Sequence, residues 1–213
     1  MTGIWEMILK GGIMMIPLIF TSIVGLAVVI ERAYFLRNRR IIRPDVVDLI
    51  NHIEKLEDIE EVVENLSNND GPFLNIVRVA LKNRGRPRDE IKEAIIDQGR
   101  QEARVLEKGL TTLETVAGIS PLLGLLGTVL GMIKVFHVIT VQGLGQTQSL
   151  SGGISEALIT TVVGLSIAIP ALVAYNYFSR KVEELVLEIE KYSNQLLEKL
   201  GRVQSRKVGK AKK

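Results

Sequence analysis

Apolar and charged positions are separated into long blocks along this chain. Three stretches carry no charged residue: Gly11–Ile30 with 20 residues, Thr115–Ile133 with 19 and Ala157–Ser179 with 23. An α-helix needs roughly 20 apolar residues to cross the hydrocarbon core of a bilayer, so each stretch is long enough to span it. The sequence therefore predicts three transmembrane helices.

The first apolar stretch has the features of an anchor and not of a cleaved signal peptide. It is longer than a typical signal core and has no small-x-small cleavage site. Charged residues follow it directly: Glu31, Arg32, Arg37, Arg39, Arg40 and Arg43.

The segment between the first two spans has a helical periodicity interrupted by turn signals. Pro44 and Asp45 open an amphipathic helix, followed by a break at 67–72, a short helix at Phe73–Lys82 and a second break at 84–87. The apolar positions of the first helix recur every three or four residues: Val46, Val47, Leu49, Ile50, Ile53, Leu56, Ile59, Val62, Val63 and Leu66.

Both later spans are expected to continue as long helices outside the membrane. Arg88–Leu113 has no proline and predicts one helix that runs directly into span two. After span three, apolar residues fall at heptad spacing: Val182, Leu185, Ile189, Tyr192 and Leu196. These residues can pack on the chain's own inner segment or between subunits around an axis, and the two arrangements are not exclusive. The predicted fold class is an all-α membrane protein with three transmembrane helices and a helical cytoplasmic region.

The distribution of basic residues predicts the orientation, because Lys and Arg are retained on the cytoplasmic side. Lys10 is the only basic residue before the first span, and five arginines follow that span. Segment 135–155 has no Lys, Arg, Asp or Glu, and span three ends on Arg180 and Lys181. We expect residues 1–10 to lie outside, followed by span one at 11–36 and a cytoplasmic helical region at 37–108. Span two at 109–137 then leads to an outer loop at 138–155. Span three at 156–179 returns the chain to the cytoplasm, where 180–213 form an amphipathic helix with a basic tail.

The composition argues against nucleic-acid, metal and cofactor binding. The net charge of +3 arises beside or beyond the spans, at 32–43 and 202–213, so we assign it to topology and lipid headgroups rather than to nucleic acid. The chain has no cysteine, and His52 and His137 lie far apart with no ligand spacing. We therefore expect no metal and no cofactor.

The stretch GISPLLGLLGTVLGM at 118–132 is rich in glycine yet has no charge. A phosphate-binding loop requires a lysine after its glycines, and none is present. In a membrane helix, Gly127 and Gly131 instead form a small-xxx-small pair, and Gly124 shares that face. These glycines predict close packing, either within the chain or between subunits.

Two prolines lie within the predicted spans, Pro121 in span two and Pro170 in span three. Each leaves a backbone carbonyl without its helical partner one turn earlier. Such a gap is tolerated in a membrane where neighbouring groups or water satisfy the carbonyl.

Few side chains in spans two and three can bind an ion or water: Thr115, Ser120, Thr128, Thr160, Thr161, Ser166 and Asn176, with Glu156 at the outer end of span three. From the helical rise, Thr128 lies about 13 Å and Thr161 about 6 Å from the outer ends of their spans. Glu156 and Thr160 share a face at i, i+4. Together these groups can line a polar track. Alternatively, each threonine bonds its own i−4 carbonyl, and Glu156 is a charge favoured at a helix start.

A proton or sodium route ordinarily requires an ionisable relay, and neither span carries a charge at mid-depth. If this chain conducts, a second protein must therefore supply the carboxylate.

Ser120-PLLGLLGTVLGM and Ile154-SEALITTVVGLSIAIPALVAYNYF, within a three-span topology, resemble the ExbB/TolQ/MotA family of ion-channel subunits over 115–180. The resemblance implies a homopentamer in the bacterial inner membrane around single-span partners of the ExbD/TolR type, each carrying a membrane aspartate. It also implies that Thr128 and Thr161 are pore threonines, that Glu156 is the family's acid and that Pro121 is its proline.

Three spans without a large cytoplasmic domain favour the ExbB/TolQ branch over the flagellar one. An ExbB-like subunit would energise a TonB-type protein for outer-membrane uptake, whereas a TolQ-like one would act with a TolA-type protein in the envelope. A different class is a passive helical scaffold. An enzyme is not expected, because the spans have no Ser/His or paired-Asp set and no HExxH motif.

Overall fold

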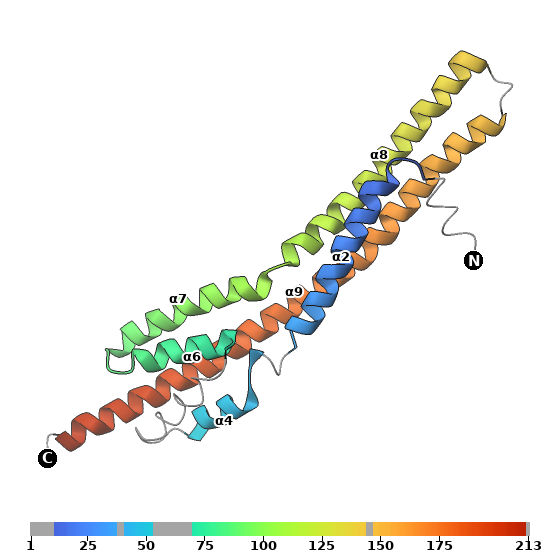
Figure 1. The fold of residues 1–213 in the computed structure, drawn as a ribbon. Coiled ribbons are helices and arrows are strands. Elements are labelled where there is room, and N and C mark those ends of the chain that lie inside the picture. Colours follow the sequence, from blue (N-terminus) through green and yellow to red (C-terminus); the bar gives the residue numbers. More distant parts are fainter. Residues whose placement is uncertain (1–10, 38–40, 53–69, 144–146, 212–213) are drawn as a thin grey trace. The chain divides into compact units, whose positions relative to one another are not determined.

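The computed structural model describes residues 11–37, 41–52, 70–143 and 147–211 of the chain (Figure 1). All regular elements within these ranges are helices: α2 at Met15–Phe35, α4 at Pro44–His52, α6 at Pro72–Lys82, α7 at Arg88–Glu107, α8 at Leu110–Gln142 and α9 at Thr147–Ala211. Three stretches are long and apolar enough to cross a membrane: Met15–Phe35, Arg88–Val141 and Leu150–Val203. The predicted fold class, all-helical with three candidate spans, is confirmed.

Spans two and three continue into long helices as expected, but the stretch before span two is interrupted. Helix α7 ends at Glu107, Lys108 is extended with ψ 134°, and Gly109 has φ +84° before α8 begins. A β-carbon at Gly109 would lie 3.3 Å from Arg32 Nε and 3.3 Å from Val28 Cγ1. The uninterrupted helix expected from Arg88 is therefore wrong at this point, because the left-handed backbone and the close approach of α2 both require glycine.

The chain divides into two compact units that share α9. The first contains residues 1–32 and 109–177, and therefore α2 to Arg32, α8 and the first part of α9. The second contains residues 33–108 and 178–213, with α4, α6, α7 and the rest of α9.

In the first unit, α8 and α9 form an antiparallel hairpin. Gly124 lies against Thr161, Gly131 against Ala157 and Val135 against Gly153, so residue numbers rise along one helix as they fall along the other. The stretch 138–155, expected as a loop, is mostly helical, because α8 reaches Gln142 and α9 begins at Thr147. The division of the chain into outer, membrane and inner segments stays a prediction.

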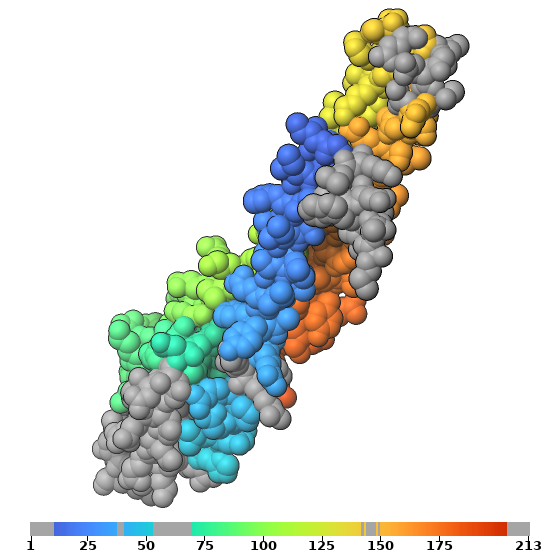
Figure 2. All heavy atoms as spheres, turned by 45° about the vertical axis from the view of Figure 1, so that its right-hand side comes forward, coloured from blue at the N-terminus to red at the C-terminus, as the bar shows by residue number. Residues whose placement is uncertain are grey.

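Helix α2 lies at the surface of this unit, and Figure 2 shows its side chains as a strip along the unit. Its buried residues are few: Met15, Leu18, Gly25 and Arg32. Gly25 faces α8, where a β-carbon would lie 3.2 Å from Val116 Cγ1. The remaining apolar side chains of α2 are largely exposed in the single chain, as expected for a helix whose solvent is lipid.

The second unit has a conventional hydrophobic core. Helix α6 begins at Pro72, which is favourable in the first helical turn because the missing N–H has no helical partner there. The rings of Phe73 in α6 and Tyr192 in α9 lie 6.0 Å apart. The other heptad residues of α9 are buried within the chain: Val182, Leu185, Ile189 and Leu196. Of the two arrangements left open for these residues, the structure shows packing on the chain's own inner segment.

The predicted amphipathic helix after span one is described only as far as His52, and its later positions lie outside the described residues. Val46, Val47 and Ile50 are buried as the periodicity predicts. Arg43 donates to Asp45, with Nη2 2.5 Å from Oδ2, and this hydrogen bond holds the pKa of Asp45 below its ordinary value. Because the pKa is lowered in the folded state, the stabilisation is present above the ordinary carboxyl pKa and is lost as the pH falls through the folded value.

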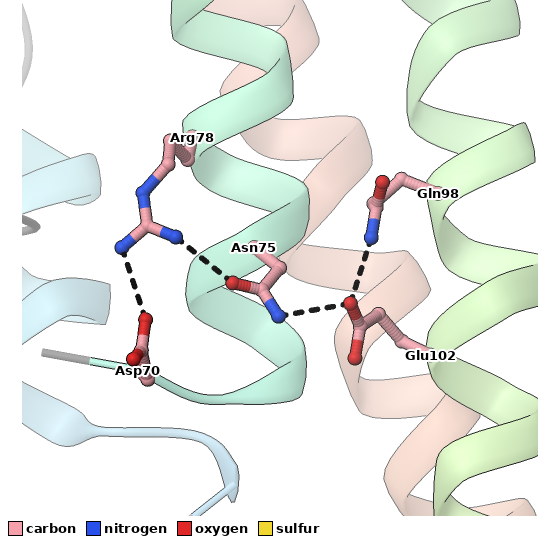
Figure 3. A network of polar contacts seen from close by, with 5 residues as sticks. All are labelled: Asp70, Asn75, Arg78, Gln98 and Glu102. Carbon is pink, nitrogen blue, oxygen red and sulfur yellow. Dashed lines mark hydrogen bonds and ion pairs between the residues drawn. The ribbon is translucent and has the colours of Figure 1, made fainter.

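A polar network crosses the second unit between α6 and α7 (Figure 3). Glu102 is 7% exposed, and its Oε1 accepts hydrogen bonds from Asn75 Nδ2 at 2.9 Å and Gln98 Nε2 at 2.7 Å. Arg78 then donates to Asn75 Oδ1 at 3.0 Å and pairs with Asp70. The buried carboxylate is thus satisfied by donors from both helices, which fixes the register of α6 on α7.

Truncating Glu102 is expected to destabilise the second unit. The Glu102→Ala change leaves the Asn75 and Gln98 amides without their buried acceptor, which costs about 1–3 kcal/mol. The measurement is the midpoint of thermal unfolding of the detergent-solubilised chain, followed by circular dichroism. Glu93→Ala, on the exposed side of the same helix, is the control. Equal unfolding midpoints for the two variants would contradict a stabilising network.

Candidate functional site

The backbones of α8 and α9 come into direct contact at their glycines. A β-carbon built on Gly124 would lie 2.9 Å from the Thr160 carbonyl oxygen, and one on Gly164 would lie 2.6 Å from the Ser120 carbonyl oxygen. One on Gly131 would lie 2.8 Å from Ala157 Cβ. Such distances leave no room for any side chain. In the single chain, these glycines therefore lie at the contact between its second and third candidate spans, and their role in setting close packing stays a prediction.

The facing surface of α9 is also lined by small residues, which the sequence analysis did not single out. Gly153, Ala157, Gly164, Ala168 and Ala171 recur every three, four or seven positions, and all except Gly153 are buried. This repeated small-residue spacing is the signal that could have identified the partner of the α8 glycines.

Two predicted pathway residues meet where the helices are closest. The hydroxyls of Thr128 and Thr161 are hydrogen-bonded to each other across the α8–α9 contact. Thr128 Oγ1 is also 3.2 Å from the Gly124 carbonyl oxygen and 3.1 Å from that of Ala157. Thr161 Oγ1 is 3.2 Å from the same Gly124 oxygen. The sequence placed these residues on separate helices at different depths, and the structure brings them together.

This arrangement allows two directions of hydrogen bonding. Each hydroxyl has one proton to donate, and the three available acceptors are the other hydroxyl and the carbonyls of Gly124 and Ala157. Thr161 can donate to Thr128 while Thr128 donates to Ala157, or Thr128 can donate to Thr161 while Thr161 donates to Gly124. A pair that can reverse its polarity without moving heavy atoms has the chemistry of a proton relay, although it has no charge of its own.

Other hydroxyls of the spans bond only within their own helix. Thr115 donates to the Thr111 carbonyl, Ser120 to Val116 and Ser166 to Val162, each four residues back. This is the ordinary arrangement of a lone hydroxyl in a membrane helix. The cross-helix bonds therefore distinguish Thr128 and Thr161 from the rest of the polar residues.

Thr160 lies beside the pair but has a different environment. It is 1% exposed, lies against Gly127, and donates to the Ala157 carbonyl at 2.8 Å. In the single chain its side chain fills the space that Gly127 leaves. Its predicted role in lining a pathway stays a prediction.

Glu156 forms an ion pair with a residue that the sequence analysis did not consider. Lys134 Nζ lies 2.5 Å from Glu156 Oε1 and joins α8 to α9 on the side of Thr128 and Thr161 that leads to the end of the hairpin. Lys134 follows the charge-free run of span two directly, and it is the one cation of α8 on the hairpin side of Thr128. Opposite charges near the facing ends of consecutive helices were the available signal. Among the described residues, no hydrogen bond joins Glu156 to Thr128, Thr160 or Thr161. The residues of the predicted polar track therefore fall into two groups in the single chain, the threonines and the Glu156 ion pair.

Neither proline ends its helix. Pro121 lies inside α8 and Pro170 inside α9, and both helices run through them. Membrane helices tolerate such prolines, as expected. Their predicted role in loosening the helices stays a prediction.

Comparison with known proteins identifies the family to which this chain belongs. The profile of the MotA/TolQ/ExbB proton channel family matches residues 68–191, more than half of the chain. The chain belongs to this family. The matched region contains the Thr128–Thr161 pair and the Lys134–Glu156 ion pair. The resemblance noted from the sequence is thereby confirmed, and the family is one of channels rather than enzymes.

Individual relatives show the same affiliation. The chain is 33% identical over 175 residues to "Putative biopolymer transport protein ExbB-like 3" of Synechocystis, covering 80% of this chain and 82% of that protein. It is 28% identical to "Putative biopolymer transport protein ExbB homolog" of Methanothermobacter thermautotrophicus, covering 87% and 66%. It is also 31% identical to "Tol-Pal system protein TolQ" of Haemophilus influenzae, covering 81% of each chain. The protein is thus a multi-pass membrane protein of the ExbB/TolQ type.

The glycine contact predicts contrasting effects of two alanine substitutions in α8. Gly127→Ala forces the new methyl group into Thr160 and is expected to destabilise the hairpin by about 1–3 kcal/mol. Gly118→Ala meets no atom within 4 Å and is expected to be neutral or to stabilise the helix by up to about 1 kcal/mol. Thermal unfolding in detergent, followed by circular dichroism, compares them. Equal midpoints would show that the intrachain contact is not required.

Proposed function

We propose that this chain is the channel-forming subunit of a proton-driven motor in the bacterial inner membrane, and that it works as an ExbB-like protein. It would couple the proton motive force to a TonB-type protein and so energise uptake across the outer membrane. The observation that carries the proposal is the Thr128–Thr161 hydroxyl pair at the contact of two membrane-type helices in a family of proton channels.

The absence of a charged side chain near this pair supports the proposal that a partner protein supplies the ionisable group. Helix α8 has no charged side chain between Glu114 and Lys134, and α9 has none between Glu156 and Arg180. A hydroxyl pair can pass a proton only if an acid or base takes it up. We propose that a single-span protein of the ExbD/TolR type supplies this group as a membrane carboxylate, and that Thr128 and Thr161 face it.

The exposed apolar surface supports assembly. Large apolar side chains of both span helices are exposed in the single chain: Leu122, Leu125, Leu126, Val129, Ile133 and Phe136 on α8, and Leu158, Val162, Leu165, Ile169, Leu172 and Val173 on α9. Lipid and other subunits are the partners for such faces. We propose a homopentamer that encloses the partner's helices, with the remaining apolar surface in lipid.

A role in the Tol-Pal envelope system, with a TolA-type protein, is the second candidate. It is favoured by the 31% identity to a TolQ protein over 81% of this chain. The ExbB-like role is preferred because relatives named for biopolymer transport match comparable or larger shares of the chain.

Removing one hydroxyl of the pair is expected to slow proton transfer. Thr128→Val and Thr161→Val keep the side-chain shape but break the relay, at a cost of about one hydrogen bond, which corresponds to a two- to tenfold lower flux. The measurement is proton uptake by proteoliposomes containing the chain and its co-purified partner.

Thr128→Ser and Thr161→Ser are the controls, because they keep the hydroxyl and are expected to retain most of the flux. The passive-scaffold alternative predicts that neither valine variant changes the flux and that no partner with a membrane carboxylate co-purifies. Either result for correctly folded variants would remove the proposed role of the pair.

Because the natural chain has no cysteine, single cysteines can test its orientation. Ser151 near the hairpin end and Lys191 in the second unit are both exposed. We expect Ser151→Cys to react with a membrane-impermeant maleimide in intact spheroplasts, and Lys191→Cys to react only after the membrane is permeabilised. The opposite labelling pattern would reverse the proposed topology.

A further inference from the structure

The ion pair between Lys134 and Glu156 takes no part in the proposed proton relay. Its two partners differ in accessibility, because the Lys134 side chain is 55% exposed and the Glu156 side chain is 19% exposed. A lysine extends a charged group on a flexible stem and can move between a partner and water. The carboxylate is therefore the fixed member of the pair, and the ammonium is the member that can leave.

A third element lies against the carboxylate. Gly12, just before α2, has φ +64°, and a β-carbon there would overlap Glu156 Oε1. This is the same oxygen that accepts the hydrogen bond from Lys134. The carboxylate thus lies between the backbone that leads into α2 and the ammonium of α8.

The pair lies between the threonine hydroxyls and the end of the hairpin. Lys134 is six residues beyond Thr128 along α8, about 9 Å by the helical rise. Glu156 is five residues before Thr161 along α9, about 7.5 Å. On both helices, a cation that approaches the hydroxyls from the hairpin end must pass the level of this pair.

We propose that Lys134 controls how readily cations enter the pathway. Its ammonium masks the negative charge of the Glu156 carboxylate at the approach to the Thr128–Thr161 pair. An unmasked carboxylate at a narrow entrance concentrates cations there, whereas a closed ion pair has no net charge and does not. While the pair is closed, Lys134 therefore removes the electrostatic attraction that would concentrate protons near the hydroxyl pair. This inference rests on the proposed function, in which the hydroxyl pair transfers protons.

The test uses proteoliposomes that contain the full chain and its co-purified partner, with an imposed pH gradient, and an internal pH-sensitive dye reports proton entry. Lys134→Met is expected to accelerate entry by roughly two- to fivefold, the effect of losing one exposed ion pair. Lys134→Arg keeps the positive charge and is expected to match the natural chain. Combining Lys134→Met with Thr128→Val should give the rate of Thr128→Val alone, because the added flux passes the hydroxyl pair.

A second double variant separates charge from packing. Lys134→Met with Glu156→Gln lacks the ion pair but has no carboxylate to attract cations, so its rate should fall below that of Lys134→Met alone. If Lys134→Met alone is not faster, or if both variants are equally fast, the masking role is wrong. The failure of the proposed function is distinguishable, because it appears in the threonine variants that retain Lys134.

Discussion

Direct contact between the backbones of α8 and α9 is the constraint on which the candidate site depends. Gly124 and Gly164 face each other, and a β-carbon on either would lie within 3.0 Å of a carbonyl oxygen of the opposite helix, so neither position can carry a side chain. In lipid, association of helices depends on such close packing, because apolar side chains gain little by leaving a solvent as apolar as themselves. Without these glycines, the threonine hydroxyls of the two helices would be held apart.

The close approach also explains why two ordinary threonines have an unusual environment. A threonine in a membrane helix usually donates to a carbonyl in its own helix. Here carbonyl oxygens of both helices come within reach: that of Gly124 lies 3.2 Å from both hydroxyls, and that of Ala157 lies 3.1 Å from the Thr128 hydroxyl. The helix packing, and not the residue type, therefore creates a hydrogen-bonded pair that can reverse its direction.

Much of this architecture was predictable because it follows from local patterns. Uncharged runs of 19 to 23 residues identify the spans, and heptad spacing identifies the buried side of the later part of α9. The breaks were harder to place. Gly109 ends one helix and starts another because of its backbone conformation and the nearby Arg32, and no periodicity encodes that tertiary contact. Helix also extends through most of 138–155, because the absence of charge and the presence of polar residues do not prevent it.

The candidate site was predictable in its residues but not in its pairings. Thr128, Thr161 and Glu156 were identified as the scarce polar groups of otherwise apolar helices. Which of them meet depends on the register of α8 on α9, which requires knowing that Gly153, Ala157 and Gly164 form the opposing surface. The sequence does not predict the role of Lys134 for the same reason. Because it directly follows an apolar run, it has the properties of a lysine at the membrane interface, and only the register of the helices places it opposite Glu156.

The distribution of charge suggests how such a subunit is insulated when it does not conduct. An isolated charge within a membrane costs about 2.5–3.5 kcal/mol on insertion scales, so a subunit with only hydroxyls at depth is inexpensive to insert and has no resident proton carrier. In the proposed function, a carboxylate supplied by a partner makes conduction depend on assembly. A closed Lys134–Glu156 pair adds a second influence, because each charge already satisfies the other. In this proposal, proton transfer depends on the arrival of an acid at the hydroxyl pair and is faster when the ion pair opens, and both features limit leakage through single subunits.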